Sequence, residues 1–163
     1  FLLLLLIPFS LTTVAWGHLV HGFPVNVISL LGVIALVGIL VNDGLVLISK
    51  FNSNLRAGKS YDESLFGAGK ERFRAIFLTS ITTMAGLAPI IFEKSFQAQS
   101  LKPMAISIAY GIGYATFLTL ILLPILLSLT NTFKLNFVWL RSGKKLDKRE
   151  VEAPVIELKR ENK

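Results

Sequence analysis

Long runs of apolar residues, separated by short polar stretches, make up most of the chain. A membrane helix needs about 20 predominantly apolar residues to cross a hydrocarbon core about 30 Å thick. Compared with that length, the apolar runs predict four membrane helices, at about 1–20, 25–50, 72–92 and 103–130. The pattern therefore predicts an all-α membrane protein whose four transmembrane helices belong to a larger helical bundle.

The composition removes several classes of protein. Of the 163 residues, 53% are hydrophobic and 17% are charged, and the mean hydropathy is +0.64. This is too apolar for a soluble domain, a disordered chain or a nucleic-acid-binding protein. The sequence has no cysteine and two histidines, which excludes disulfides and thiolate metal sites and disfavours a zinc site built from histidine.

The positive charges predict the orientation in the membrane. Segment 50–74 contains six lysines and arginines and the tail after residue 133 contains nine, whereas 21–24 contains none and 93–102 contains two. Because such residues cross the bilayer reluctantly during insertion, both rich segments are expected in the cytoplasm. Four spans then place Phe1 on the cytoplasmic side as well. The chain opens without a Met, a basic n-region or a cleavage site, so we expect it to be the C-terminal part of a longer protein.

The cytoplasmic segment between the second and third spans contains a helix signal. Ser60 is followed three residues later by Glu63, the spacing of a capping box at a helix N-terminus. This predicts a short cytoplasmic helix at about 61–68, separate from the membrane helix that follows.

Two further segments are expected at the membrane surface or beyond it. Trp16, His18 and His21 fit an interfacial belt. We divide the chain into a membrane part, 1–132, and a tail, 133–163, whose first residues intersperse aromatic and basic side chains as interfacial segments do. From residue 142 onward the tail is charged and poor in aromatics, which predicts that it is mostly disordered.

Asp43 is the residue most indicative of chemistry, because an ionisable side chain inside a membrane span is costly and marks a functional site by default. Gly38 and Gly44 lie near it in the sequence, and because glycine has no side chain, another helix can approach closely there. The alternative interpretation is structural, with a carboxylate that snorkels or bonds to a neighbouring helix.

The third predicted span carries a matching polar stripe. Arg72, Ile76, Thr79, Thr83 and Gly86 are spaced by three and four residues and so share one helix face, which we expect to lie toward Asp43. Two alternatives remain open. Hydroxyls in membrane helices often bond back to a carbonyl one turn earlier, and the arginine can serve only to set the orientation.

Three segments resemble one known family, the resistance-nodulation-division (RND) transporters, and specifically their inner-membrane drug and metal efflux pumps. They are IPFSLTTVAWGHLVHGFPVNVISLLGVIALVGILVNDGLVLISKFN, GKERFRAIFLTSITTMAGLAPIIFE and SFQAQSLKPMAISIAYGIGYATFLTLILLPILL. The resemblance covers about residues 7–130. It implies transmembrane helices nine to twelve of a twelve-helix protomer, and a homotrimer in the bacterial inner membrane with a periplasmic adaptor and an outer-membrane channel.

The resemblance also implies a proton relay. By position, Asn42 and Asp43 match the relay site of the tenth helix, and Arg72 and Thr79 match the arginine and threonine of the eleventh. The best-studied multidrug branch has a lysine where this chain has Asn42, so the ion pair made by that lysine is missing. An aspartate pair of the fourth helix would lie outside this chain.

These observations together predict part of an RND exporter that moves small molecules by proton antiport, uses the proton-motive force without a cofactor, and is not an enzyme. An intramembrane aspartyl protease requires two paired aspartates, and this chain has one intramembrane acid. A passive membrane subunit leaves the polar stripe unexplained. A related RND lipid exporter or secretion-assisting protein remains a further alternative, and the exported substrate is not specified by these residues.

Overall fold

The computed structural model describes residues 2–142 and 147–161 of the chain, and these residues form five α-helices. They are α1 (Leu2–His21), α2 (Val27–Arg56), α3 (Tyr61–Phe92), α4 (Phe96–Ser142) and α5 (Ala153–Glu161). The first four are long and apolar enough to cross a membrane. No strand occurs in either described range, and the predicted all-α class with four membrane helices is confirmed.

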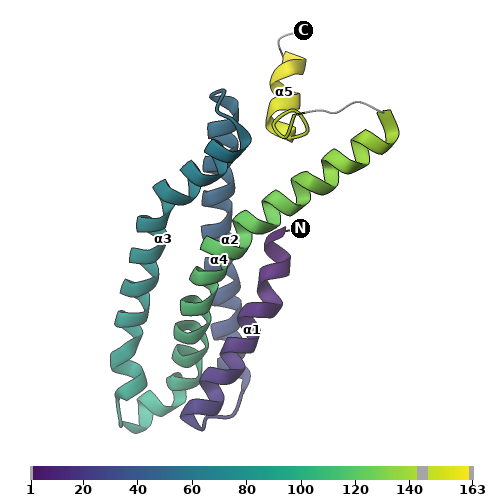
Figure 1. Cartoon of the computed structure of the whole chain (residues 1–163). Helices are drawn as coiled ribbons and strands as arrows, with labels where there is room; N and C mark the ends of the chain where they lie inside the picture. The colour runs from purple at the N-terminus through teal and green to yellow at the C-terminus, as the bar shows by residue number, and fades with distance from the viewer. Residues whose placement is uncertain (1, 143–146, 162–163) are drawn as a thin grey trace.

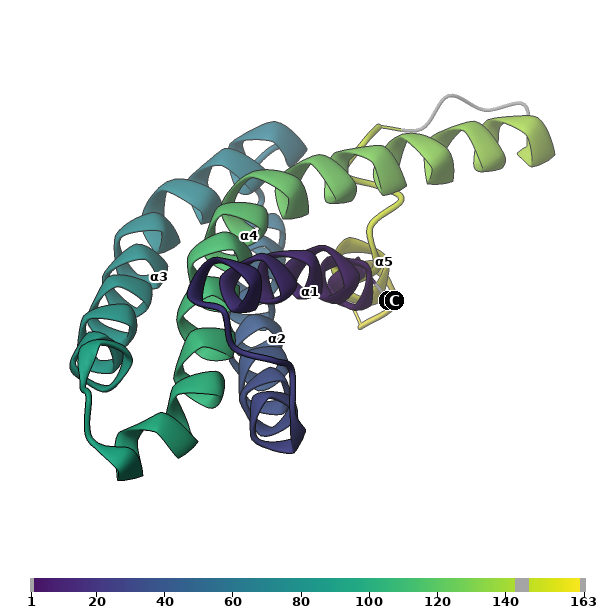
Figure 2. The ribbon, with the colours of Figure 1, turned by 90° about the horizontal axis from the view of Figure 1, so that it is seen from below.

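Helices α1 to α4 run side by side as a bundle, and α4 is its central element (Figures 1 and 2). It packs against α1, α2 and α3, and α2 also packs against α3. Leu36 and Leu40 of α2 and Ile112 of α4 belong to the core cluster between the helices. Large apolar side chains such as Ile34 and Phe117 remain exposed, as expected for helices that face lipid or further membrane helices.

Glycine permits a close contact between the backbones of α2 and α4. A methyl group placed at Gly32 would lie 2.7 Å from the backbone oxygen of Met104 and 2.8 Å from Cβ of Ser107. The obstacle includes backbone, so a side chain at this position would have to push the two helices apart. The absence of a side chain at Gly32 is therefore what lets α2 pack closely against α4.

Gly32→Ala is expected to destabilise the complete protein by about 1–3 kcal/mol, the usual cost of overpacking a filled interior. The measurement is the midpoint of thermal unfolding in detergent. Gly86→Ala is the matched control, because a methyl group there meets nothing within 4 Å. Equal losses in both variants would contradict the packing role assigned to Gly32.

The predicted short helix at 61–68 is not a separate element. The Ser60 hydroxyl accepts a hydrogen bond from the Glu63 amide and the Glu63 carboxylate accepts one from the Ser60 amide, so the capping box is formed as expected. The helix does not end at 68, however, and continues as α3 to Phe92. The charged residues between 68 and 72 do not stop a helix, because lysine, glutamate and arginine are good helix formers.

The tail also differs from expectation. Helix α4 continues through the predicted interfacial segment to Ser142, and residues 147–161 form turns followed by α5. Val155 of α5 is buried in a second core cluster with Phe51 and Leu55 of α2, which stabilises a segment predicted to be disordered. The prediction of disorder for 143–146 and 162–163 concerns residues outside the described ranges.

Polar contacts hold the tail against the C-terminal end of α2, the N-terminal end of α3 and the side of α4. The Asn131 amide donates to the Lys148 carbonyl and to the buried Glu152 carboxylate, each at 2.7 Å. Ion pairs join Lys134 to Glu152 at 2.9 Å, Arg56 to Glu157 at 2.9 Å and Lys148 to Asp62 at 3.2 Å. We call the end of the bundle that carries these contacts the basic end.

A second polar cluster lies at the opposite end and corrects the expectation for the histidines. His18 is 3% exposed, and its ring nitrogens lie 2.8 Å from the Ser29 hydroxyl and 3.0 Å from the Val14 carbonyl oxygen. The His21 ring lies 3.0 Å from the Tyr110 hydroxyl. These side chains connect α1 to α2 and α4 instead of facing a lipid interface, whereas Trp16 is 64% exposed, as an interfacial residue is.

Candidate functional site

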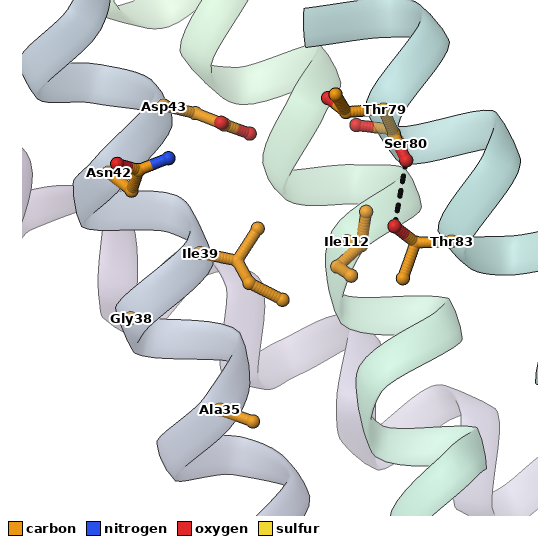
Figure 3. A pocket seen from close by; sticks show the side chains of 9 residues that line it. All are labelled: Ala35, Gly38, Ile39, Asn42, Asp43, Thr79, Ser80, Thr83 and Ile112. Carbon is orange, nitrogen blue, oxygen red and sulfur yellow. Dashed lines mark hydrogen bonds between the residues drawn. The ribbon is translucent and has the colours of Figure 1, made fainter.

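A cavity of about 390 Å³ lies between α2 and α3, with a residue of α4 behind it (Figure 3). Its lining combines an acid, an amide and three hydroxyls with small and apolar side chains. The lining residues are Ala35, Gly38, Ile39, Asn42, Asp43, Thr79, Ser80, Thr83 and Ile112. Asp43 is the one ionisable side chain in this described lining, so it dominates the electrostatics of the cavity.

Helix α2 places the acid deep in the membrane part of the fold. Asp43 comes 16 residues after Val27 and 13 before Arg56, which puts it about 24 Å and about 20 Å from the two ends of the helix at 1.5 Å per residue. Its side chain is half-buried and extends from α2 toward Thr79 and Ser80 of α3 (Figure 3). A methyl group at Gly38 would meet nothing within 4 Å, so this glycine leaves open space five residues before the acid.

Helix α3 supplies the hydroxyls, and each of them lies within hydrogen-bond distance of a carbonyl oxygen three or four residues earlier in the same helix. Thr79 donates to the Ile76 carbonyl oxygen at 2.9 Å, and Thr83 donates to the Thr79 carbonyl oxygen at 2.7 Å, the bond drawn in Figure 3. The alternative of local back-bonding is therefore realised in the structure. It does not remove these residues from the site, since both also line the cavity.

A contact that the sequence pattern does not predict fixes the back of the cavity. The Ser80 hydroxyl forms a hydrogen bond with the Thr116 hydroxyl of α4, and both side chains are buried. Thr116 in turn donates to the Ile112 carbonyl oxygen at 2.8 Å. The only available signal was a hydroxyl residue in a charge-free run, which does not tell which neighbouring helix the side chain meets.

Arg72 is not brought into the cavity. It precedes Thr79 by seven residues on α3 and so lies about 10 Å closer to the basic end. Its Nε atom is buried and has no hydrogen-bond partner. The neighbouring Glu71 pairs with Lys50 of α2 at 2.6 Å, so the arginine lies beside the ion pair that joins the two cavity-lining helices.

The four residues predicted for the relay thus fall into two groups. Asn42, Asp43 and Thr79 line one cavity, together with Ser80 and Thr83. Arg72 lies on the same helix as the threonines but two turns away. The arrangement can hold a positively charged species against a carboxylate near the middle of the membrane part, with a fixed cation on the side of the basic end.

Comparison with known proteins gives one family. The model of the AcrB/AcrD/AcrF family matches residues 1–131. The chain is 31% identical over 125 residues to the cobalt-zinc-cadmium resistance protein CzcA of Cupriavidus metallidurans, a match that covers 77% of this chain and 12% of CzcA. No solved structure matches the chain.

Two further relatives extend the range of named functions. The nickel and cobalt resistance protein CnrA of Cupriavidus metallidurans is 32% identical over 120 residues, covering 74% of this chain and 11% of CnrA. The multidrug resistance protein MdtC of Serratia proteamaculans is 28% identical over 127 residues, covering 77% and 12%. The chain thus spans about an eighth of the length of these relatives. With four membrane helices and this family match, the chain is a multi-pass membrane protein that belongs to the AcrB/AcrD/AcrF family of RND efflux transporters.

Proposed function

We propose that this chain carries coupling protons through the membrane domain of an RND exporter, with Asp43 as the group that takes them up and releases them. The observation that carries the proposal is the cavity between α2 and α3, in which Asp43 is the one ionisable side chain of the described lining. An acid at this depth is expensive to keep charged, and binding a proton relieves that cost. Proton antiport therefore has a chemically suitable carrier here.

The other predicted residues have supporting roles in this proposal. Thr79 borders the cavity opposite Asp43 and can help to hold water next to the carboxylate. Asn42 is neutral, so no lysine in the lining balances the charge of the acid. Arg72 is the fixed cation toward the basic end, and we propose that it favours the ionised form of the acid when the site opens to that side.

The wider function follows the same reasoning. CzcA and CnrA are named for metal resistance and MdtC for multidrug resistance, and we propose that the complete transporter exports a metal cation or a drug. It would act in the bacterial inner membrane as a homotrimer with a periplasmic adaptor and an outer-membrane channel. No cofactor or covalent catalysis is part of this proposal, because the proton-motive force supplies the energy. Replacing the Asp43 carboxyl with an amide tests the proposal, since export should then stop.

We further propose that the basic end faces the cytoplasm and the loops near residues 22 and 97 face the periplasm. In the complete transporter without other accessible cysteines, Ser53→Cys and Gln97→Cys should react with an impermeant thiol reagent from opposite sides. Both residues are exposed, so failure to label does not reflect burial within this chain. Labelling of both from the same side would contradict the orientation inferred from the lysines and arginines.

A further inference from the structure

A second cavity, of about 620 Å³, lies between α3 and α4 close to the basic end. It shares no residue of its described lining with the cavity at Asp43. Most of its lining is apolar and comes from both helices: Leu65, Phe66, Leu120, Ile121, Pro124 and Ile125. We call this cavity the α3–α4 groove.

The course of α4 leaves the groove accessible from the side. Pro124 lies inside α4, and a proline within a helix removes a backbone hydrogen bond and favours a kink. The last part of α4 leans away from the bundle (Figure 1). Phe66 of α3 and Ile121 and Ile125 of α4 are exposed at the groove. The groove therefore presents large apolar side chains to whatever lies beside these two helices.

The charged groups of the groove leave a positive charge without a partner. Asp62 borders the groove, but its carboxylate pairs with Lys148 at 3.2 Å. Lys70 also borders the groove, and it is exposed and forms no ion pair within the described residues. The same holds for Arg74, one turn further along α3. The groove thus combines apolar walls with an excess of positive charge.

Charge and apolar surface follow each other along the two helices in the order found in a phospholipid. Phe73 and Phe77 follow Lys70 on the same face of α3, at spacings of three and four residues. Their stacked rings, with centroids 5.5 Å apart, are exposed. On α4, the exposed Phe117 lies one turn further from the basic end than Ile121. Because helical side chains lean toward the helix N-terminus, Lys70 extends back toward the basic end.

We propose that the α3–α4 groove binds an anionic phospholipid, with its phosphate at Lys70 and its acyl chains along the apolar walls. Basic pockets between membrane helices are suited to such headgroups. The bilayer supplies this ligand in the leaflet that adjoins the basic end. A zwitterionic phospholipid fits the apolar walls equally well, but it lacks the net negative charge that an unpaired cation favours. The inference does not depend on the role proposed for Asp43.

The test places a fluorescent label in the groove of the complete transporter, in phosphatidylcholine vesicles. Gly69 is a suitable position, because it lines the groove and a methyl group there would meet nothing within 4 Å. In a transporter without other accessible cysteines, bimane on Gly69→Cys should be quenched more strongly by phosphatidylglycerol with brominated acyl chains than by brominated phosphatidylcholine. We expect a preference of about fivefold, which corresponds to the roughly 1 kcal/mol that one basic side chain contributes at an anionic membrane surface.

Bimane on Gly86→Cys is the control for the position of the label. Gly86 is also on α3 and has nothing within 4 Å of an added methyl group, but it does not line the groove. The two brominated lipids should quench this label equally. The same preference for phosphatidylglycerol at both positions would overturn the assignment of the lipid to the groove.

A charge variant with its own control completes the test. Lys70→Gln should abolish the preference at Gly69→Cys and leave quenching by both lipids, whereas Lys59→Gln should keep it. Lys59 is exposed at the same end but does not line the groove. Equal quenching by the two lipids with Lys70 in place, or equal loss of preference in both variants, overturns the proposal. So does the absence of quenching by either lipid, since another part of the transporter then covers the groove.

Discussion

Asp43→Asn is expected to reduce resistance of cells carrying the complete transporter to the level of cells without it, while the protein remains inserted and assembled. The amide is nearly isosteric with the carboxyl and cannot take up or release a proton near neutral pH. Removing a half-buried charge also avoids the cost of desolvating it, so folding should not suffer. The loss therefore reports on titration of the acid and not on packing. The measurements are the growth limit in the presence of substrate and the amount of transporter in the membrane.

Asp62→Asn provides a control with the same chemical change outside the cavity. Asp62 pairs with Lys148 at the basic end, and the two side chains are 60% and 52% exposed, so the pair contributes little to stability. This variant should keep normal resistance. Normal resistance in Asp43→Asn at unaltered expression would instead show that the acid is structural, and that coupling runs through residues outside this chain.

Arg72→Ala is expected to cause a severe loss of export, larger than that of Thr79→Ala. Water can replace the threonine hydroxyl in the cavity, because ordered water can make nearly equivalent hydrogen bonds. Nothing in the described lining replaces a fixed positive charge. The buried Nε atom of the arginine is without a hydrogen-bond partner in this structure, so this donor is available when the neighbouring helices rearrange. Initial rates of export at equal expression measure both effects.

Two variants separate the role of this arginine from a general effect of charge. Arg74→Ala removes the same charge from an exposed position two residues away and should leave export unchanged, even though it lowers the positive charge that orients the protein. Arg72→Lys should retain part of the activity, since it keeps the charge but loses the planar set of donors. If Arg74→Ala impairs export as much as Arg72→Ala, the arginines act only through orientation.

The number and type of the membrane helices could be predicted from the sequence, but their ends could not. Charge-free length identifies the part of a helix that fits the hydrocarbon core, and it carries no information on how far the helix extends beyond. Helix α3 therefore begins at Tyr61 and α4 ends at Ser142, well outside the predicted spans. The ordered tail was also missed, because its stability depends on a core cluster in which Val155 joins residues such as Phe51 that are distant in sequence.

For the candidate site, the sequence predicts the residues but not how they are oriented toward the neighbouring helices. Depth in an apolar run singled out Asp43, and the spacing of the hydroxyls placed Thr79 and Thr83 on one face of their helix. Spacing fixes which residues share a face, but it does not fix the rotation of that face toward a neighbour. For this reason the Ser80 contact with Thr116 was not foreseen, and the spacing did not tell that Arg72 stays outside the cavity that Thr79 lines.

The contacts at the basic end join α2 and α3, the two helices that enclose the cavity, directly to each other. The four-residue connection 57–60 joins α2 to α3, Lys50 and Glu71 pair across them, and the tail contacts both through Arg56 and Asp62. At the far end, α2 is held to α1 through Ser29 and His18, whereas α3 continues after residue 92 into α4. Away from the basic end, both helices are held through α4 instead, by the contact of Gly32 with Met104 and Ser107 and by the hydrogen bond of Ser80 with Thr116. The width of the gap at Asp43 is therefore set by a direct ion pair on one side and by shared packing on α4 on the other.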